Sequence, residues 1–304
     1  MKKKYMLGSI IMISLLMISC SSKMDILQVG IISPSTNHLS LLIALDEGLI
    51  NDNEIKIHRF SSGWEANEAL INGKIDLAIM PFTYAWQAVS ERRKVKIISF
   101  LERESDGIIA HRNITAINDL DGKKLGVLRA STLDIFFQML LDDYNILPEV
   151  IYFRTPTEMA TALQNGYVDA LSFYVPPLFH FDDNFHILLW YSELYPEHPC
   201  CDILVYEDSL VNKKEQIERF LEGVKIGCQI LESDSDQGIK TIMSNFGLAR
   251  DVAEKTLKQQ KFKLGLEPSG KEFQEKVARK MLELGYLRAT VSSQEVYYDF
   301  FEVE

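Results

Sequence analysis

Two stretches of the sequence decide the expected fold: Ala69-Leu-Ile-Asn-Gly-Lys-Ile-Asp76 and Ala162-Leu-Gln-Asn-Gly-Tyr-Val-Asp169, which lie 93 positions apart. The match extends upstream to two further pairs, Phe60 with Phe153 and Glu65 with Glu158. Each copy covers a strand end, a helix cap, a helix, a glycine stop and a strand start. The repeat therefore predicts two lobes of similar build. Two short αβ units that converge on the same caps and stops for local reasons would leave the same pattern, so this alternative stays open.

Strand-like and helical patterns alternate outward from these stretches. Short apolar runs predict strands over residues 26–32, 55–57, 75–80, 124–128, 150–153, 169–173 and 201–206. Between them, Leu42, Leu45 and Leu49 recur at helical spacing, and Ser62 and Ser131 stand where helix caps are expected. Such alternation predicts an α/β protein whose lobes each have a mainly parallel central sheet flanked by helices.

The domain boundaries follow from where the helical part begins. Residues from about 212 to the end are mostly helical, and returning to the first lobe is the economical way to pack them. We therefore expect lobe 1 over residues 20–105, lobe 2 over 106–203, and a return to lobe 1 with C-terminal helices over 204–304. Two crossover segments would join the lobes, near residues 100–109 and 201–206.

Composition excludes several classes of protein. The chain has 304 residues, 47% hydrophobic and 25% charged, which are ordinary values for a globular protein and unlike those of disordered chains. The formal net charge is −11 and no basic stretch resembles a nucleic-acid-binding footprint, so we expect no nucleic-acid partner. The same acidic balance argues against a broad membrane-binding surface.

The N-terminus has the pattern of an export signal. Lys2, Lys3 and Lys4 precede an apolar run over residues 5–18 that is short for a membrane span. The run ends in Leu16-Met-Ile-Ser-Cys20, which resembles a bacterial lipobox although Met17 departs from the usual Leu. We expect residues 1–19 to be a signal peptide and Cys20 to carry the lipid anchor, on the periplasmic or outer side of a membrane. An uncleaved anchor or a plain signal peptide is the alternative, and each of these exports the protein.

Few residues point to catalysis or metal binding. The sequence has no G-x-S-x-G, H-E-x-x-H, Walker or G-x-G-x-x-G motif. Cys200 and Cys201 follow His198, but no second ligand pair lies at a recognisable spacing, so buried small side chains in a strand are expected there. Cys228 makes the number of remaining cysteines odd, which is a poor basis for disulfides. We expect no metal, no cofactor and no catalytic residue.

The candidate ligand-binding residues follow from the strand order. In open α/β sheets, ligands bind beyond the carboxyl ends of the strands, opposite helix N-termini. Hydroxyl groups and aromatic rings at these positions suit a small polar or flat ligand. The candidates are Ser35, Thr36, Asn37, Ser62, Gly63, Trp64, Phe82, Thr83, Tyr84, Arg129, Ser131, Thr132 and Tyr174. Each has a structural alternative: serines cap helices, aromatic rings pack in cores, and Arg129 can pair with a surface acid.

An ordered set of motifs carries a resemblance to a known family. The motifs are the lipobox, residues 30–37, Ala44-Leu-Asp-Glu-Gly-Leu49, residues 69–76, Leu120-Asp-Gly-Lys-Lys-Leu-Gly-Val127, Arg129-Ala-Ser-Thr132 and residues 162–170. In this order they resemble the substrate-binding proteins of ABC importers in the nitrate/sulfonate/taurine and thiamine-pyrimidine-precursor superfamily. The resemblance implies a type II periplasmic-binding fold, a monomer that holds a small-molecule ligand between its lobes, and delivery to a membrane permease driven by an ATPase.

Departures from the family pattern bear on the ligand. Ala130 stands where the family often has Gly, and few cationic side chains accompany the aromatic candidates. These features favour a flat heterocycle of the pyrimidine type, while helix N-termini could still hold a sulfonate or nitrate. Two other functions remain open: a pyrimidine-precursor synthase-like enzyme on the same fold, and a ligand-sensing lipoprotein of a signalling system.

Overall fold

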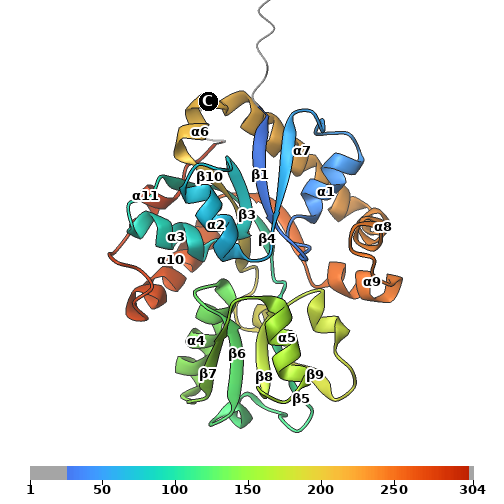
Figure 1. Ribbon diagram of the computed structural model, residues 1–304, viewed down its shortest axis with the longest axis vertical. Helices are drawn as coiled ribbons and strands as arrows, with labels where there is room; N and C mark the ends of the chain where they lie inside the picture. Colours follow the sequence, from blue (N-terminus) through green and yellow to red (C-terminus); the bar gives the residue numbers. More distant parts are fainter. Residues whose placement is uncertain (1–25, 301–304) are drawn as a thin grey trace, which may run out of the picture.

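The computed structural model describes residues 26–300 and divides them between two β-sheets, one in each lobe (Figure 1). The larger sheet contains β1 (Leu27–Ile32), β2 (Ile55–Phe60), β3 (Leu77–Pro81), β4 (Val95–Arg103), β10 (Pro199–Tyr206) and β11 (Lys261–Gly265). The smaller sheet contains β5 (Asp106–His111), β6 (Lys124–Leu128), β7 (Glu149–Phe153), β8 (Ala170–Tyr174) and β9 (Phe185–Trp190). The expected signal peptide and Cys20 lie outside the described residues.

Helices cover both faces of each sheet. In the larger lobe they are α1 (Leu39–Asp46), α2 (Gly63–Ile71), α3 (Thr83–Ser90), α6 (Glu207–Asn212), α7 (Lys214–Ser233), α8 (Ser235–Phe246), α9 (Arg250–Lys258), α10 (Pro268–Glu283) and α11 (Ser293–Val296). In the smaller lobe they are α4 (Thr132–Tyr144) and α5 (Pro156–Gln164), with the 3₁₀ turns η1 (Ile117–Leu120), η2 (Pro177–His180) and η3 (Tyr191–Glu193). Among the helices described, none is both long and apolar enough to cross a bilayer.

The α/β fold with two lobes is confirmed, and its sheets are mixed. The larger sheet has the order β11-β4-β10-β3-β1-β2 and the smaller one β7-β6-β8-β5-β9. The predicted parallel pairing holds within β2-β1-β3 and within β7-β6-β8. Antiparallel pairs appear where the crossover strands join, because β10 pairs against β3 and β4, and β5 pairs against β8 and β9.

The repeated Asp residues play the same structural part in both lobes. Asp76 precedes β3 and accepts a hydrogen bond from the backbone N–H of Gln28 in β1, at 2.7 Å. Asp169 precedes β8 and accepts one from the backbone N–H of Lys124 in β6, at 2.8 Å. Each carboxylate therefore ties the third strand of its unit to the first.

The repeated helix starts are equivalent as well. The Ser62 hydroxyl accepts from the backbone N–H of Glu65 at the start of α2, and the Thr155 hydroxyl accepts from that of Glu158 at the start of α5, both at 3.3 Å. Such caps satisfy backbone donors that a helix leaves unpaired at its N-terminus. The local chemistry of the repeat thus builds one αβ unit in each lobe.

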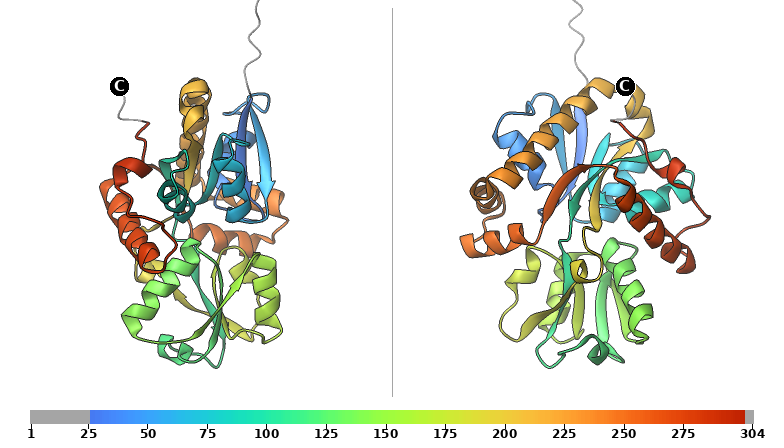
Figure 2. Two further views of the ribbon diagram at one scale, coloured as in Figure 1. Left: turned by 60° about the vertical axis from the view of Figure 1, so that its left-hand side comes forward. Right: turned by 180° about the vertical axis from the view of Figure 1, so that it is seen from behind.

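Successive side chains of β3 point to opposite faces of the larger sheet and belong to different parts of its core. Leu77 and Ile79 pack with α1 and α7 on one face of the sheet, and Ala78 and Met80 pack with α2, α3 and α10 on the other. A strand covered on both faces reads as a continuous apolar run, which is why the sequence pattern there is apolar throughout. Figure 2 shows the same layers from the side and from behind.

Two adjacent segments join the lobes. The chain leaves the larger sheet after Arg103 and enters β5 at Asp106, and it returns between Trp190 and Pro199. Pro199 pairs with Arg103, so the two crossings lie side by side. Because β10 already belongs to the larger sheet from Pro199 onward, the return comes a few residues before the boundary expected at residue 203.

Candidate functional site

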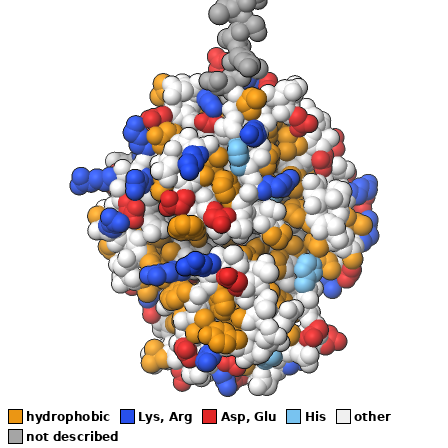
Figure 3. Space-filling view, in the orientation of Figure 1, with side chains coloured by type: hydrophobic (Ala, Val, Ile, Leu, Met, Phe, Trp, Pro, Cys, Tyr) orange, Lys and Arg blue, Asp and Glu red, His pale blue; other side chains and the backbone are white. Residues whose placement is uncertain are grey.

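A cleft with a cavity volume of about 40 Å³ lies between the two lobes. It opens at the carboxyl ends of β1, β3 and β6, and at the N-termini of α2, α4 and α5. Its lining residues are Ile32, Ser35, Asn37, Ser62, Gly63, Pro81, Tyr84, Asp106, Leu128, Ser131, Thr132, Leu133, Pro156, Tyr174, Cys200 and Cys201. On the face seen in Figure 3 the two lobes are in contact. Both lobes therefore supply walls to one site.

Eight of the thirteen candidate residues line this cleft. The larger lobe supplies one group and the smaller lobe the other: Ser35, Asn37, Ser62, Gly63 and Tyr84 from the first, and Ser131, Thr132 and Tyr174 from the second. The positions share one physical origin, since each follows a strand end or opens a helix. Their role in ligand binding is a prediction that binding experiments must test.

Three of the other candidates are buried away from the cleft lining. Thr36 is fully buried and its hydroxyl donates to the side-chain oxygen of Gln260 at 2.7 Å. Phe82 and Thr83 are also fully buried, at the start of α3. The ring of Phe82 packs within the core between α3 and the sheet. The start of α3 thus places Tyr84 at the cleft and the two residues before it in the protein interior.

The remaining two candidates also lie outside the lining. Trp64 follows Gly63 on the first turn of α2, and 61% of it is exposed to solvent. The Arg129 guanidinium lies over the rings of Tyr152 and Tyr286, 5.7 Å from each centroid. These cation–π contacts engage the guanidinium outside the cleft lining.

The wall from the larger lobe depends on a close approach between Gly63 and Tyr84. A Cβ atom on Gly63 would lie 2.5 Å from Cε2 of the Tyr84 ring, so only glycine allows this packing. Burial raises the pKa of the Tyr84 hydroxyl far above its usual value. The ring therefore presents a neutral phenol and a flat apolar face to the cleft.

The wall from the smaller lobe touches the opposite lobe directly. The Tyr174 hydroxyl donates to the backbone carbonyl of Pro34, across the cleft, at 3.3 Å. Ser131 caps α4 by accepting from the backbone N–H of Asp134 at 3.4 Å. The Tyr174 contact therefore joins the two walls of the cleft, and the Ser131 cap fixes the start of α4 beside it.

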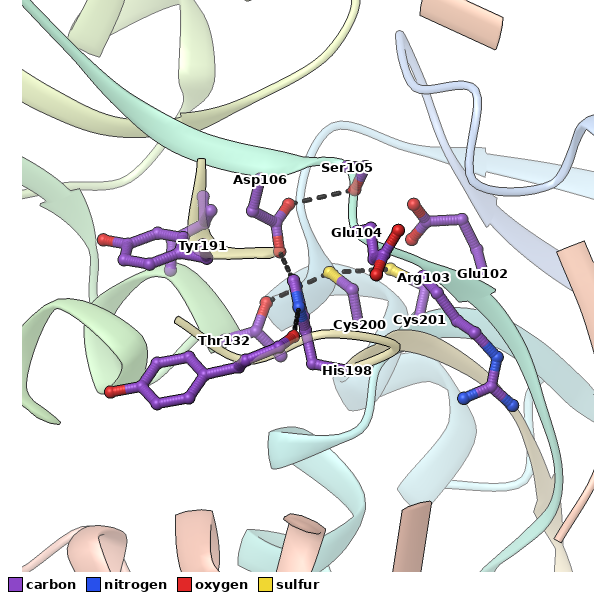
Figure 4. A network of polar contacts seen from close by, with 12 residues as sticks. Glu102, Arg103, Glu104, Ser105, Asp106, Thr132, Tyr191, His198, Cys200 and Cys201 are labelled. Carbon is purple, nitrogen blue, oxygen red and sulfur yellow. Dashed lines mark hydrogen bonds and ion pairs between the residues drawn. The ribbon is translucent and has the colours of Figure 1, made fainter. Parts of the chain in front are cut away.

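The cleft floor contains three residues that sequence reasoning missed: Asp106, Cys200 and Cys201. The sequence analysis expected both cysteines to be buried small side chains of a strand, and adjacent residues of a regular strand point to opposite faces. Pairing between β10 and β4 shifts register on both sides of Cys201, and the two Sγ atoms lie 4.0 Å apart (Figure 4). An acid at the start of the apolar run 107–110, in a crossover segment, is the signal that could have identified Asp106.

The cleft floor is rich in hydrogen-bond acceptors. Asp106 is almost completely buried, and burial raises its pKa; its Oδ1 accepts from the Ser105 hydroxyl at 3.0 Å. His198 Nε2 lies 3.9 Å from Asp106 Oδ2, but burial lowers the pKa of His198 to about 4, so the imidazole is neutral at pH 7. Among the residues that the structure describes, no Lys or Arg lines the cleft.

The thiols on the floor are poor nucleophiles in this state. A hydrogen bond with Cys201, followed by burial, raises the pKa of Cys200 well above its usual range, and burial raises the pKa of Cys201 to about 11. The thiolate is the nucleophilic form of cysteine, and it is scarce at neutral pH under these conditions. The arrangement is suited to holding a small molecule by hydrogen bonds and ring contacts.

The two sheets, the crossover strands and the interlobe cleft define a periplasmic-binding-protein fold. The profile of a family described as "NMT1/THI5 like" matches residues 35–237. The chain belongs to this NMT1/THI5-like family, which confirms the resemblance seen in the sequence. None of the curated proteins compared with the chain is similar enough to count as a match.

Solved structures agree on the fold. The periplasmic aliphatic sulphonate-binding protein SsuA of Escherichia coli has a TM-score of 0.78 at 18% identity, over 91% of this chain and 93% of that one. The alkanesulfonate-binding protein SsuA of Xanthomonas axonopodis pv. citri, bound to MOPS, has a TM-score of 0.79 at 18% identity, over 89% and 97%. The periplasmic nitrate-binding protein NrtA of Synechocystis PCC 6803 has a TM-score of 0.72 at 13% identity, over 88% and 83%.

Proposed function

We propose that this protein is the solute-binding receptor of an ABC-type importer. It is exported, anchored by a lipid on Cys20, and captures a small molecule between its lobes for delivery to a permease and its ATPase. One observation carries the proposal: hydroxyls and tyrosine rings from both lobes line a single cleft at strand ends and helix N-termini. The periplasmic binding proteins of similar fold support it.

The chemistry of the cleft favours a flat heterocycle with N–H donors over an anion. Asp106 places a buried carboxyl group on the floor, and its Oδ2 has no hydrogen-bond partner among the described residues. A sulfonate or nitrate would meet this group with no Arg or Lys among the described lining residues to offset it. An amino-substituted, pyrimidine-type ring would donate to Asp106 and lie against Tyr84 and Tyr174.

The enzyme alternative lacks support from the cleft. A pyrimidine-precursor synthase-like reaction that uses pyridoxal phosphate needs a lysine to form a Schiff base with that aldehyde. No lysine is among the lining residues that the structure describes. Incubating the protein with pyridoxal phosphate tests this alternative, because a Schiff-base absorbance that depends on one lysine would favour the enzyme.

Calorimetric titration of the purified protein tests the proposal. We expect saturable binding of aminopyrimidines and none of nitrate or short alkanesulfonates. Asp106→Asn should weaken aminopyrimidine binding at least tenfold, on the order of one lost charge-assisted hydrogen bond. Asp183→Asn, at an exposed position of the same lobe, is the matched control and should bind as the wild type does. Absence of saturable binding for every small polar or heterocyclic compound tried would refute the receptor function.

A further inference from the structure

Three side chains with metal-binding atoms meet at the cleft floor. One ligand atom from each of Glu102, Cys200 and Cys201 lies within 4.8 Å of the other two. Glu102 and Cys201 are fully buried and Cys200 is nearly so. Figure 4 shows them where β4 and β10 run side by side at the junction of the lobes. Cys200 and Cys201 also line the cleft, but the ligand contacts proposed above, to Asp106, Tyr84 and Tyr174, involve none of these three side chains.

The sheet itself brings the three groups together. Cys201 in β10 is the direct cross-strand partner of Glu102 in β4. The register shift next to Cys201 brings the Cys200 thiol to the same side, with 4.0 Å between the two Sγ atoms. Two thiolates on one tetrahedral zinc ion, with Zn–S bonds of about 2.3 Å, are separated by about 3.8 Å. The thiols are therefore close to the spacing that a shared ion requires.

The residues around these three side chains offer more buried hydrogen-bond acceptors than donors. Glu102 Oε1 accepts from the Gln260 amide at 3.3 Å, but Glu102 Oε2 has no hydrogen-bond partner among the described residues. Asp106 Oδ2 and Asn37 Oδ1 are also buried and without partners in the described part of the chain. The adjacent cation, Arg103, forms its ion pair with Glu267 at 2.5 Å instead. Buried acceptors in this number are normally matched by a donor or by a cation.

We propose that Cys200, Cys201 and Glu102 bind one thiophilic divalent metal ion, such as Zn²⁺, in the floor of the cleft. Two sulfur ligands select Zn²⁺ and similar ions over Mg²⁺ and Ca²⁺, which prefer oxygen. Binding releases the thiol protons, and the carboxyl proton where one is present, to solvent, so the ion is held by two thiolates and a carboxylate. Because both cysteines line the cleft, the fourth coordination position faces it.

Cobalt titration of the full chain provides the test. Protein prepared without metal and kept reduced with a phosphine is titrated with Co²⁺, followed by Zn²⁺. We expect one Co²⁺ per chain, with thiolate-to-cobalt charge-transfer absorption that Zn²⁺ abolishes. The double variant Cys200→Ser/Cys201→Ser should lose the band, and Glu102→Gln should weaken Co²⁺ binding at least tenfold. Cys228→Ala removes the third buried cysteine, in α7, and is the matched control that keeps the band.

A measurement on the wild type covers the case in which a variant does not fold. Zn²⁺ should slow alkylation of Cys200 and Cys201 and leave that of Cys228 unchanged, as read by mass spectrometry of peptides. No 1:1 binding, a band that persists in the double variant, or equal protection of all three cysteines would overturn the metal site. Solute binding is measured separately on the metal-free wild type, so its absence would refute the receptor function and leave the metal site standing.

Discussion

Gly63→Ala tests whether the contact between Gly63 and Tyr84 shapes the cleft. The added Cβ would lie 2.5 Å from Cε2 and 3.2 Å from Cδ2 of the Tyr84 ring, and 3.3 Å from Cδ of Pro81. Carbon atoms pack at about 3.5 Å or more, so the ring must retreat by about 1 Å. Tyr84 is almost fully buried within the core cluster, which leaves the ring little room. Overpacking of this kind costs about 1–3 kcal/mol.

The gain in helix propensity offsets part of this cost. Replacing Gly by Ala favours a helix interior by about 1 kcal/mol, and by less on the first turn, where Gly63 lies. We therefore expect a net loss of about 1–2 kcal/mol in the free energy of unfolding, measured with urea. Ligand affinity should fall as well, measured by calorimetry, because the displaced ring forms one wall of the cleft.

A double-mutant cycle identifies the cause. If the clash with the ring is responsible, Gly63→Ala should cost little in a Tyr84→Ala background, where the ring is gone. Equal destabilisation in both backgrounds, or a wild-type-like stability for Gly63→Ala alone, would refute the reasoning.

Three further predictions concern stability. Burial lowers the pKa of His38 to about 3, whereas the same histidine in the unfolded chain has a pKa near 6.5. As the pH drops below 6.5 the unfolded chain therefore takes up a proton that the folded protein does not. The free energy of unfolding should fall in consequence, by about 2 kcal/mol at pH 5. His38→Gln should remove this part of the pH dependence of urea unfolding, and an unchanged slope would contradict the assignment. Gly227→Ala places a Cβ 2.1 Å from a backbone carbonyl oxygen of α1 and should lower the thermal midpoint strongly. Gly223→Ala meets Cγ1 of the Ile50 side chain at 2.4 Å, with the nearest backbone atom at 3.5 Å, and should cost less because a side chain shifts more easily than the backbone; the reverse order would exclude backbone contact as the reason. Asp76→Ala should lower the free energy of unfolding by about 2 kcal/mol and Asp169→Ala by about 1 kcal/mol, because Asp76 also pairs with Lys213 and Ser209. Equal losses for the two variants in denaturant unfolding would show that these extra partners contribute nothing.

Much of the fold could be predicted because its local units carry their own signals. Ser62 and Ser131 occupy the cap positions that the sequence indicated, and the repeated Asp76 and Asp169 close equivalent strand pairs. Eight of the thirteen candidate residues lie in the cleft lining, since strand ends and helix starts are local features that the sequence indicates; their role in ligand binding stays a prediction. Trp64 shows the limit: its place on the first turn of α2 was evident, but its exposure depended on how α2 lies against the sheet.

The sequence by itself determined the two αβ units, their caps and the strand ends at which a cleft could form, because these depend on residues close together along the chain. Only the tertiary structure decided the cleft floor. Asp106 and the adjacent Cys200 and Cys201 come from crossover strands, and a register shift in β10 brings the two thiols together. Such shifts arise from pairing between strands about 100 residues apart, and the amino-acid sequence alone does not show in which register those strands pair.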